Sequence, residues 1–132
     1  MLTEAEKRDL EEMVVPLRFA QQSIYALNKR VGWWDDAPTV GEKHRKVPEK
    51  IALCHSELSE ALEAHRKDLM DDKLPNRFGI EVELADCIIR ILDLAQALGL
   101  DVAAAIIDKV HYNAEREDHK RENRAKQGGK RY

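Results

Sequence analysis

Cysteine is scarce in this 132-residue chain: Cys54 and Cys87 are the two present, and they do not form a Cys-x-x-Cys pair. Both fall on apolar faces of helical patterns, where cysteine behaves as a small buried hydrophobe. The sequence therefore argues against a disulfide framework and gives little support to a zinc site. We expect a protein of a reducing compartment, the cytoplasm.

The chain also lacks an excess of charge of either sign. Its 22 basic and 25 acidic side chains nearly cancel, although charged residues make up 36% of the sequence. A surface of this kind has no broad field to attract nucleic acid, so we expect no nucleic-acid partner. Any chemistry must come from local clusters of side chains.

Long apolar runs are missing as well. None approaches the roughly 20 residues that a membrane-spanning helix needs, and the start "MLTEAEKRDL" has no apolar leader segment, so no membrane partner is expected. A hydrophobic content of 43% over this length suits a single domain. We expect residues 1–132 to form it, with a core over about 17–117 and a basic tail over 118–132.

Strand patterns are absent, since no stretch alternates with period two. Apolar residues recur instead at helical spacing, which predicts an all-α fold, an antiparallel bundle of four to five helices. The residues expected to form its core stripes are Ile51, Cys54, Leu58, Ala61, Leu62 and His65 on one helix and Ile80, Leu84, Cys87, Ile91, Leu94 and Leu98 on the next. The first helical arm should start at a capping box of Thr3 and Glu6 and be kinked or divided near Pro16. The expected helices run from Thr3 to about Val31, from Pro48 to about Leu69, from about Ile80 to Leu98, and from Asp101 to roughly Glu117, with a loop over 32–47.

Motifs for nucleophilic catalysis and for Walker-type nucleotide binding are not found. The Glu-x-x-His motif of carboxylate-bridged di-iron bundles is not found either. The five histidines lie on separate segments or on an apolar stripe, so packing or surface roles are expected for them.

What the sequence does contain is two acidic pairs with matched spacing. Glu57 and Glu60 lie at i, i+3 on one expected helix, and Glu83 and Asp86 repeat the spacing on the next. Each pair shares a face with apolar residues, unlike an ordinary solvated face with lysines at i+4. Consecutive helices joined by a short connection are antiparallel neighbours, so we expect these four carboxylates to converge.

Converging carboxylates need a cation, because two like charges about 4 Å apart repel by roughly 4 kcal/mol at an effective dielectric near 20. All-oxygen ligands favour a hard ion, and Mg²⁺ usually shares its coordination with substrate phosphates. The pattern predicts a Mg²⁺ site, with Mn²⁺ as an alternative. The competing interpretation is that both pairs are solvated surface acids, offset by Arg66, Lys67 and Arg90.

The last expected helix carries cationic and amide side chains on one face: Lys109, Asn113 and Arg116. Lys109 and Arg116 could hold phosphate oxygens, and the Asn113 amide could bond a sugar or base. A solvated face is the alternative, and it suits Arg116 better than Lys109.

Together these motifs resemble those of the MazG-like, all-α nucleoside triphosphate pyrophosphohydrolases. That family carries Glu-x-x-Glu on one helix, Glu-x-x-Asp on the next, and a lysine and an asparagine on the following helix. The matches here are Glu57-Leu58-Ser59-Glu60, Glu83-Leu84-Ala85-Asp86, and Lys109 with Asn113. The ending "GGKRY" is also similar to tails of some members.

The resemblance implies hydrolysis of a nucleoside triphosphate between its α and β phosphates, with Mg²⁺ held by the four carboxylates. It makes Glu57, Glu60 and Lys109 the candidate catalytic residues, with Glu57 the candidate to take the proton of the attacking water. It also implies a homodimer or homotetramer. Many members have two adjacent glutamates where this chain has Ser56-Glu57, so the number of metal ions and the residue that activates water stay open.

Trp33 and Trp34 lie in the first expected loop, where an indole could stack on a base; packing at a subunit contact is the alternative. Two further functions stay open. One is a nucleotide-binding or regulatory module with weak catalysis, which Ser56 would suit. The other is a plain helical oligomerisation domain, which the acidic quartet disfavours.

Overall fold

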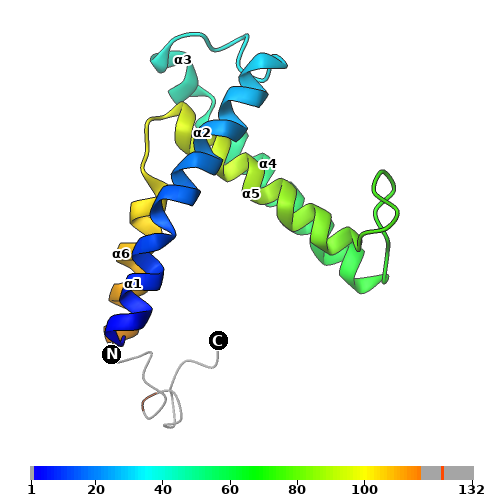
Figure 1. Cartoon of the computed structure of the whole chain (residues 1–132). Coiled ribbons are helices and arrows are strands. Elements are labelled where there is room, and N and C mark those ends of the chain that lie inside the picture. Colours follow the sequence, from blue (N-terminus) through cyan, green and yellow to red (C-terminus); the bar gives the residue numbers. More distant parts are fainter. Residues whose placement is uncertain (1, 117–122, 124–132) are drawn as a thin grey trace. The chain divides into compact units, whose positions relative to one another are not determined.

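The computed structural model of the chain describes residues 2–116 and residue 123. Over these residues the protein is all-α, as expected, with no strand and one isolated bridge between Met70 and Phe78. None of the described helices is long and apolar enough to cross a membrane. The expected basic tail lies outside the described residues apart from Asn123. The helices are α1 (Glu4–Glu12), α2 (Val14–Arg30), α3 (Val40–Arg45), α4 (Val47–Arg66), α5 (Gly79–Ala97) and α6 (Val102–Glu115) (Figure 1).

The chain divides into two compact units. The first comprises the residues up to Phe19 and those from Asp101 onward, and it contains α1, the start of α2, and α6. The second is Ala20–Leu100, which contains the rest of α2 with α3, α4 and α5. The acidic pairs belong to the second unit and Lys109 belongs to the first.

The first helical arm is two helices, which was one of the two expected outcomes. The capping box at its start is confirmed, because the Thr3 side chain accepts a hydrogen bond from the Glu6 N–H and the Glu6 carboxylate accepts one from the Thr3 N–H. α1 ends at Glu12 and α2 begins at Val14. Pro16 therefore lies in the first turn of α2, where its missing N–H breaks no helical hydrogen bond.

A second capping box creates a helix that was not expected. Thr39 and Glu42 exchange the same pair of hydrogen bonds and start α3 within the segment predicted to be a loop. This short helix and the division of the first arm bring the described chain to six helices, where four to five were expected. The cap of α6 is as expected, since the Asp101 carboxylate accepts from the Ala104 N–H at 3.1 Å.

α4 and α5 lie side by side as an antiparallel hairpin (Figure 1). Ala64 lies beside Gly79 near the connecting loop, and farther along the Cys87 thiol donates to the carbonyl oxygen of Cys54 at 3.6 Å. Both cysteines are free. The small side chains along this line let the two helices approach closely, which positions the acidic residues described below.

A buried carboxylate fastens the segment after α2 to α5. Asp93 is 1% exposed, and its oxygens accept hydrogen bonds from the indole N–H of Trp34 at 3.0 and 3.2 Å and from the side-chain amide of Asn28 at 3.2 Å. Trp34 packs with Ala37 and Ala97 in the small core of this unit. A buried carboxylate is unfavourable unless it is hydrogen-bonded, so these bonds fix how the segment lies on α5.

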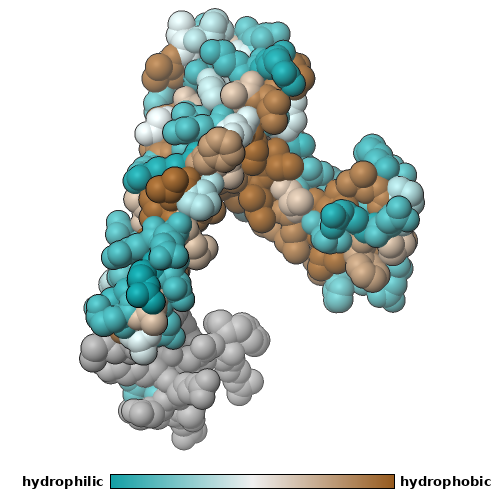
Figure 2. All heavy atoms as spheres, in the orientation of Figure 1, coloured by the Kyte–Doolittle hydropathy of each residue, from teal (hydrophilic) through white to brown (hydrophobic). Residues whose placement is uncertain are grey.

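Much of the apolar stripe that we expected to form the core is exposed in a single chain. Hydrophobic side chains run along the α4–α5 hairpin (Figure 2). Two helices bury only the faces along their line of contact, and here that line carries Ala61, Ala64 and Cys87. The prediction of an internal core stripe was wrong for five large residues, which are between 42% and 58% exposed: Ile51, Leu58, Leu62, Leu84 and Ile91.

The close approach of α4 and α5 predicts a specific sensitivity at Gly79. A Cβ added there would lie 2.9 Å from the Cβ of Ala64 and 3.2 Å from the carbonyl oxygen of Leu69. Gly79→Ala should therefore destabilise the protein by about 1–3 kcal/mol in urea unfolding. The control is Gly41→Ala on α3, where the added Cβ meets nothing within 4 Å. Equal losses of stability in both variants would contradict the close approach.

Candidate metal centre

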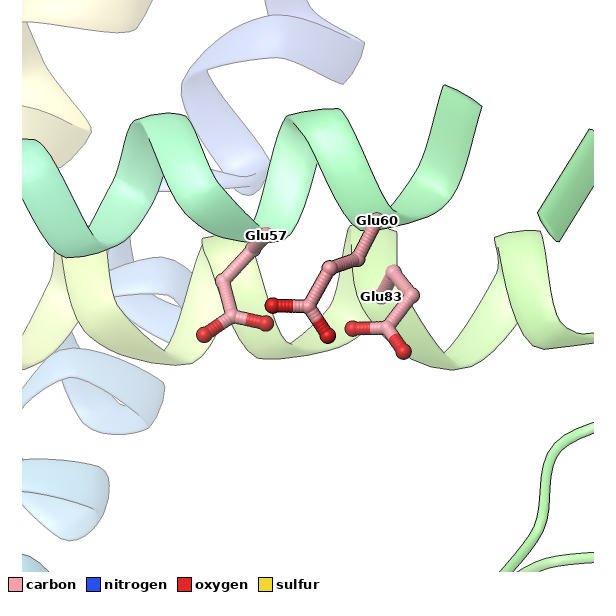
Figure 3. Close-up of side chains that lie close together, drawn as sticks. All are labelled: Glu57, Glu60 and Glu83. Atoms are coloured by element: carbon pink, nitrogen blue, oxygen red, sulfur yellow. The ribbon is translucent and has the colours of Figure 1, made fainter. Parts of the chain in front are cut away.

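Three glutamate carboxylates meet on one side of the α4–α5 hairpin. Glu57 and Glu60 project from α4 and Glu83 projects from α5 (Figure 3). One carboxylate oxygen of each residue lies within 4.8 Å of the other two. This is the convergence that the matched spacing predicts. Asp86, the fourth expected member, lies outside this tight group but lines the same cavity.

Helix geometry explains why the acids are held together. Glu57 is in one row with Ala61 and Ala64, at i, i+4 and i+7, on the face of α4 that packs against α5. It is only 6% exposed, whereas Glu60 lies at the exposed edge of that face. The small alanines bring α5 close enough for Glu83 to reach the pair. Water can therefore screen the repulsion at Glu57 only weakly.

The crowding changes the proton affinity of Glu83. Burial is the main cause that raises the pKa of this carboxyl group to about 7, followed by a hydrogen bond with Glu57 and repulsion from Glu60, Glu57 and Asp86. A group with this pKa is protonated for part of the time at neutral pH. A proton on Glu83 thus supplies some of the positive charge that the cluster needs.

A cation already contacts the most buried carboxylate. Nε of Arg90 donates to Oε1 of Glu57 at 2.6 Å. The Arg90 guanidinium also lies 5.5 Å from the ring centroid of Trp33. From the sequence, Arg90 was considered only as an offset for solvated acids. In the structure it is the partner of a buried one, which makes it part of the site.

The carboxylates border a cavity of about 540 Å³. Part of its lining comes from the loop between α4 and α5, including Asp71, Asp72, Lys73 and Leu74. Asp71 shapes this loop, since its Oδ1 accepts hydrogen bonds from the N–H groups of Lys73, at 3.0 Å, and Leu74. From the sequence, this segment was expected only to connect two helices. The neighbouring acids Asp71 and Asp72 were a signal in the sequence that this loop belongs to the site, but no helical periodicity linked them to the acidic pairs.

The two tryptophans lie in different environments. Trp34 is 2% exposed and donates its N–H to Asp93, so its ring belongs to the packing of this unit. Trp33 is 37% exposed and lies next to Arg90 at the carboxylate site, with Nζ of Lys50 5.5 Å from its ring centroid. Of the pair, Trp33 is therefore the one placed beside the candidate site.

The substrate residues expected on the last helix lie in the first unit. Lys109 is exposed, and its Nζ is 4.6 Å from the ring centroid of Tyr112. The guanidinium of Arg116, at the end of α6, lies 5.6 Å from the same ring. The side-chain oxygen of Asn113 is buried and has no hydrogen-bond partner among the described residues. Tyr112, which joins the two cations, was not singled out in the sequence.

The donor set fits a hard divalent cation. The three converging ligands are carboxylate oxygens, with no thiolate or imidazole in the group. Mg²⁺ and Mn²⁺ favour such oxygen donors, whereas zinc and copper sites usually recruit nitrogen or sulfur. The raised pKa of Glu83 and the guanidinium that contacts Glu57 both indicate that the cluster favours positive charge.

Comparison of the chain with protein-family models, curated proteins and solved structures finds no match. The chemistry of the site therefore has to be argued from its own residues, and the resemblance to the MazG-like family remains a prediction from motifs.

The raised pKa of Glu83 predicts how the metal-free protein responds to pH. A carboxyl group whose pKa rises from 4.5 to about 7 on folding holds its proton more tightly in the folded state. Its stabilising contribution is complete below about pH 4.5 and is lost as the pH rises through about 7. Glu83→Gln removes that loss, so it should raise the melting temperature at about pH 8 and leave it nearly unchanged at about pH 5.

The measurement is a series of thermal melts in chelator across this pH range. Glu63→Gln is the control, because Glu63 is exposed on the same helix as Glu60 and pairs with Lys67 at the surface. Parallel pH profiles for wild type and Glu83→Gln would show that the carboxylates do not interact as described.

Proposed function

We propose that this protein is a Mg²⁺-dependent nucleoside triphosphate pyrophosphohydrolase of the MazG-like type, which produces a nucleoside monophosphate and pyrophosphate. The observation that carries the proposal is the convergence of Glu57, Glu60 and Glu83 within 4.8 Å. The adjoining cavity of about 540 Å³ has room for phosphate groups beside the carboxylates. Mg²⁺ bound by one or two carboxylates commonly completes its coordination with substrate phosphates and water.

In this proposal, Glu57, Glu60, Glu83 and Asp86 hold the metal. Bound Mg²⁺ supplies charge neutralisation of the phosphates and a water of lowered pKa. Glu57 is the candidate general base, because it belongs to the cluster and its Oε1 accepts a hydrogen bond from Nε of Arg90. Its carboxylate takes the proton from the attacking water.

The other residues expected to bind substrate keep their roles in this proposal. Lys109 and Arg116 are proposed to hold phosphate oxygens, and Asn113 is proposed to recognise the sugar or base. The buried, unpaired oxygen of Asn113 supports this role, since it needs a donor such as a hydroxyl or amino group. Trp33 is proposed to contact the base, because it is the partly exposed indole beside Arg90.

We also propose that the chain forms a homodimer or homotetramer through the exposed apolar stripe of α4 and α5. Leu84, Ile88 and Ile91 recur at i, i+4 and i+7 on α5, and Ile51, Leu58 and Leu62 provide the stripe of α4. This spacing is typical of helix faces buried in a bundle. A second hairpin packed on the stripe would complete a four-helix bundle.

The alternative functions can be weighed against particular residues. A plain oligomerisation domain would account for the apolar stripe, but repelling carboxylates would only weaken its fold. A regulatory module that binds nucleotide without turnover would use the same site. Ser56 bears on that choice, because its hydroxyl donates to the carbonyl oxygen of Leu53 at 2.8 Å and supplies no further carboxylate. Turnover of a nucleoside triphosphate decides between the regulatory module and the pyrophosphohydrolase.

A panel of nucleoside triphosphates incubated with Mg²⁺ should yield pyrophosphate for at least one base. Glu60→Gln should lower kcat/KM by roughly a hundredfold or more, because it removes a metal-binding and candidate catalytic carboxylate. Glu63→Gln, on the same helix, should retain activity. Release of orthophosphate in place of pyrophosphate would contradict cleavage between the α and β phosphates, and binding without product would favour the regulatory module.

Disrupting the apolar stripe should dissociate the oligomer. Leu62→Lys places a charge on the stripe, so light scattering should show a smaller particle than the wild type. Leu74→Lys is the matched control, since Leu74 is similarly exposed but lies in the loop outside the stripe. A monomeric wild type, or equal masses for all three proteins, would contradict the assembly.

A further inference from the structure

We infer that Arg90 is a phosphate-binding residue: a guanidinium that rests on Glu57 in the metal-free protein and contacts phosphate oxygens of the bound triphosphate. This inference deepens the proposed function and rests on it, because the substrate supplies the phosphates. It assigns a binding role to a residue that the three acidic and basic motifs do not include.

The position of Arg90 supports this role. It lies one turn beyond Asp86 and two turns beyond Glu83 on α5, so all three share one helix face. Arg90 lines the same cavity as the carboxylates, and its side chain is 26% exposed. It therefore stands at the boundary between the metal-binding acids and the partly exposed ring of Trp33, 5.5 Å away.

The donor capacity of Arg90 is only partly used. Within the described residues its guanidinium donates from Nε to Glu57, and neither terminal nitrogen makes a hydrogen bond. A guanidinium presents a planar fork of donors that matches two phosphate oxygens. Lys73, also on the cavity lining, is 87% exposed and lies 3.8 Å from Asp72. Arg90 is the better placed of the two for a desolvated phosphate.

The charges in the site favour an exchange of partners. Arg90 compensates the charge of Glu57, whose side chain is 8% exposed. A divalent cation held by Glu57 would take over that compensation and would repel the neighbouring guanidinium. Phosphate groups of a bound substrate would then supply the negative charge that Arg90 needs. Binding of the metal and binding of the phosphate should therefore reinforce each other at this residue.

Titration calorimetry of the full chain with Mn²⁺ alone, and with pyrophosphate in the presence of Mn²⁺, tests the inference. Arg90→Gln should bind pyrophosphate at least about tenfold more weakly than wild type, because a charged hydrogen-bond donor is lost. Its affinity for Mn²⁺ alone should be equal or higher, because a competing cation is gone. Arg90→Lys should fall between the two proteins for pyrophosphate, since it keeps the charge and loses the fork.

Arg77→Gln is the matched control, because Arg77 pairs with Glu81 at the same 2.6 Å but on an exposed surface. Unchanged pyrophosphate affinity in both Arg90 variants would overturn the inference. Loss of Mn²⁺ binding in folded Arg90→Lys would also overturn it, because that result would show that Arg90 only positions Glu57. A wild type that binds no pyrophosphate would overturn it as well. Thermal melts establish whether each variant is folded. If Arg90→Gln is unfolded, the pyrophosphate affinity of Arg90→Lys provides the test.

These binding measurements need no turnover. A wild type that hydrolyses no triphosphate would defeat the proposed function, while pyrophosphate affinity would still decide the role of Arg90.

Discussion

The mutual repulsion of carboxylates on the α4–α5 hairpin is the constraint around which the second unit is organised. Glu57 is too buried for water to screen it well, and Glu60 and Glu83 lie within 4.8 Å. Two features relieve the repulsion: the raised pKa of Glu83, about 7, which favours a proton there, and the guanidinium of Arg90. In our proposal, a bound metal would displace the proton and a bound phosphate would take over the guanidinium contact.

Groups that repel stay together only where packing leaves them no alternative. Here the close contact of Gly79 with Ala64 sets the separation of the two helices next to the acids. The hydrogen bond from Trp34 to Asp93 holds the segment after α2 against α5, and this places the ring of Trp33 5.5 Å from the guanidinium of Arg90. Rigid packing around a polar site is how proteins preorganise binding groups, and it links the small core of this unit to its proposed function.

The parts of the molecule that follow from local signals could be predicted from the sequence. Helical periodicity and matched acidic spacing were sufficient for α4, α5 and the convergence of three of the four expected carboxylates, whereas Asp86 lines the cavity outside the tight group. α3 was missed because its six residues are too few to show a period, although the capping box at Thr39 was present. The apolar stripe was misplaced because periodicity shows which residues share a face, not whether the same chain covers it. The pairing of Glu57 with Arg90, 33 residues away, depends on tertiary packing.

A crystal structure of the protein soaked in Mn²⁺ would test the central claim most directly, because anomalous scattering locates the ion independently of any assay. The proposed metal centre predicts an anomalous peak bonded to carboxylate oxygens of Glu57, Glu60 and Glu83. An ordered hairpin with the three carboxylates in place and no peak between them, at a Mn²⁺ concentration that occupies other sites, would contradict it.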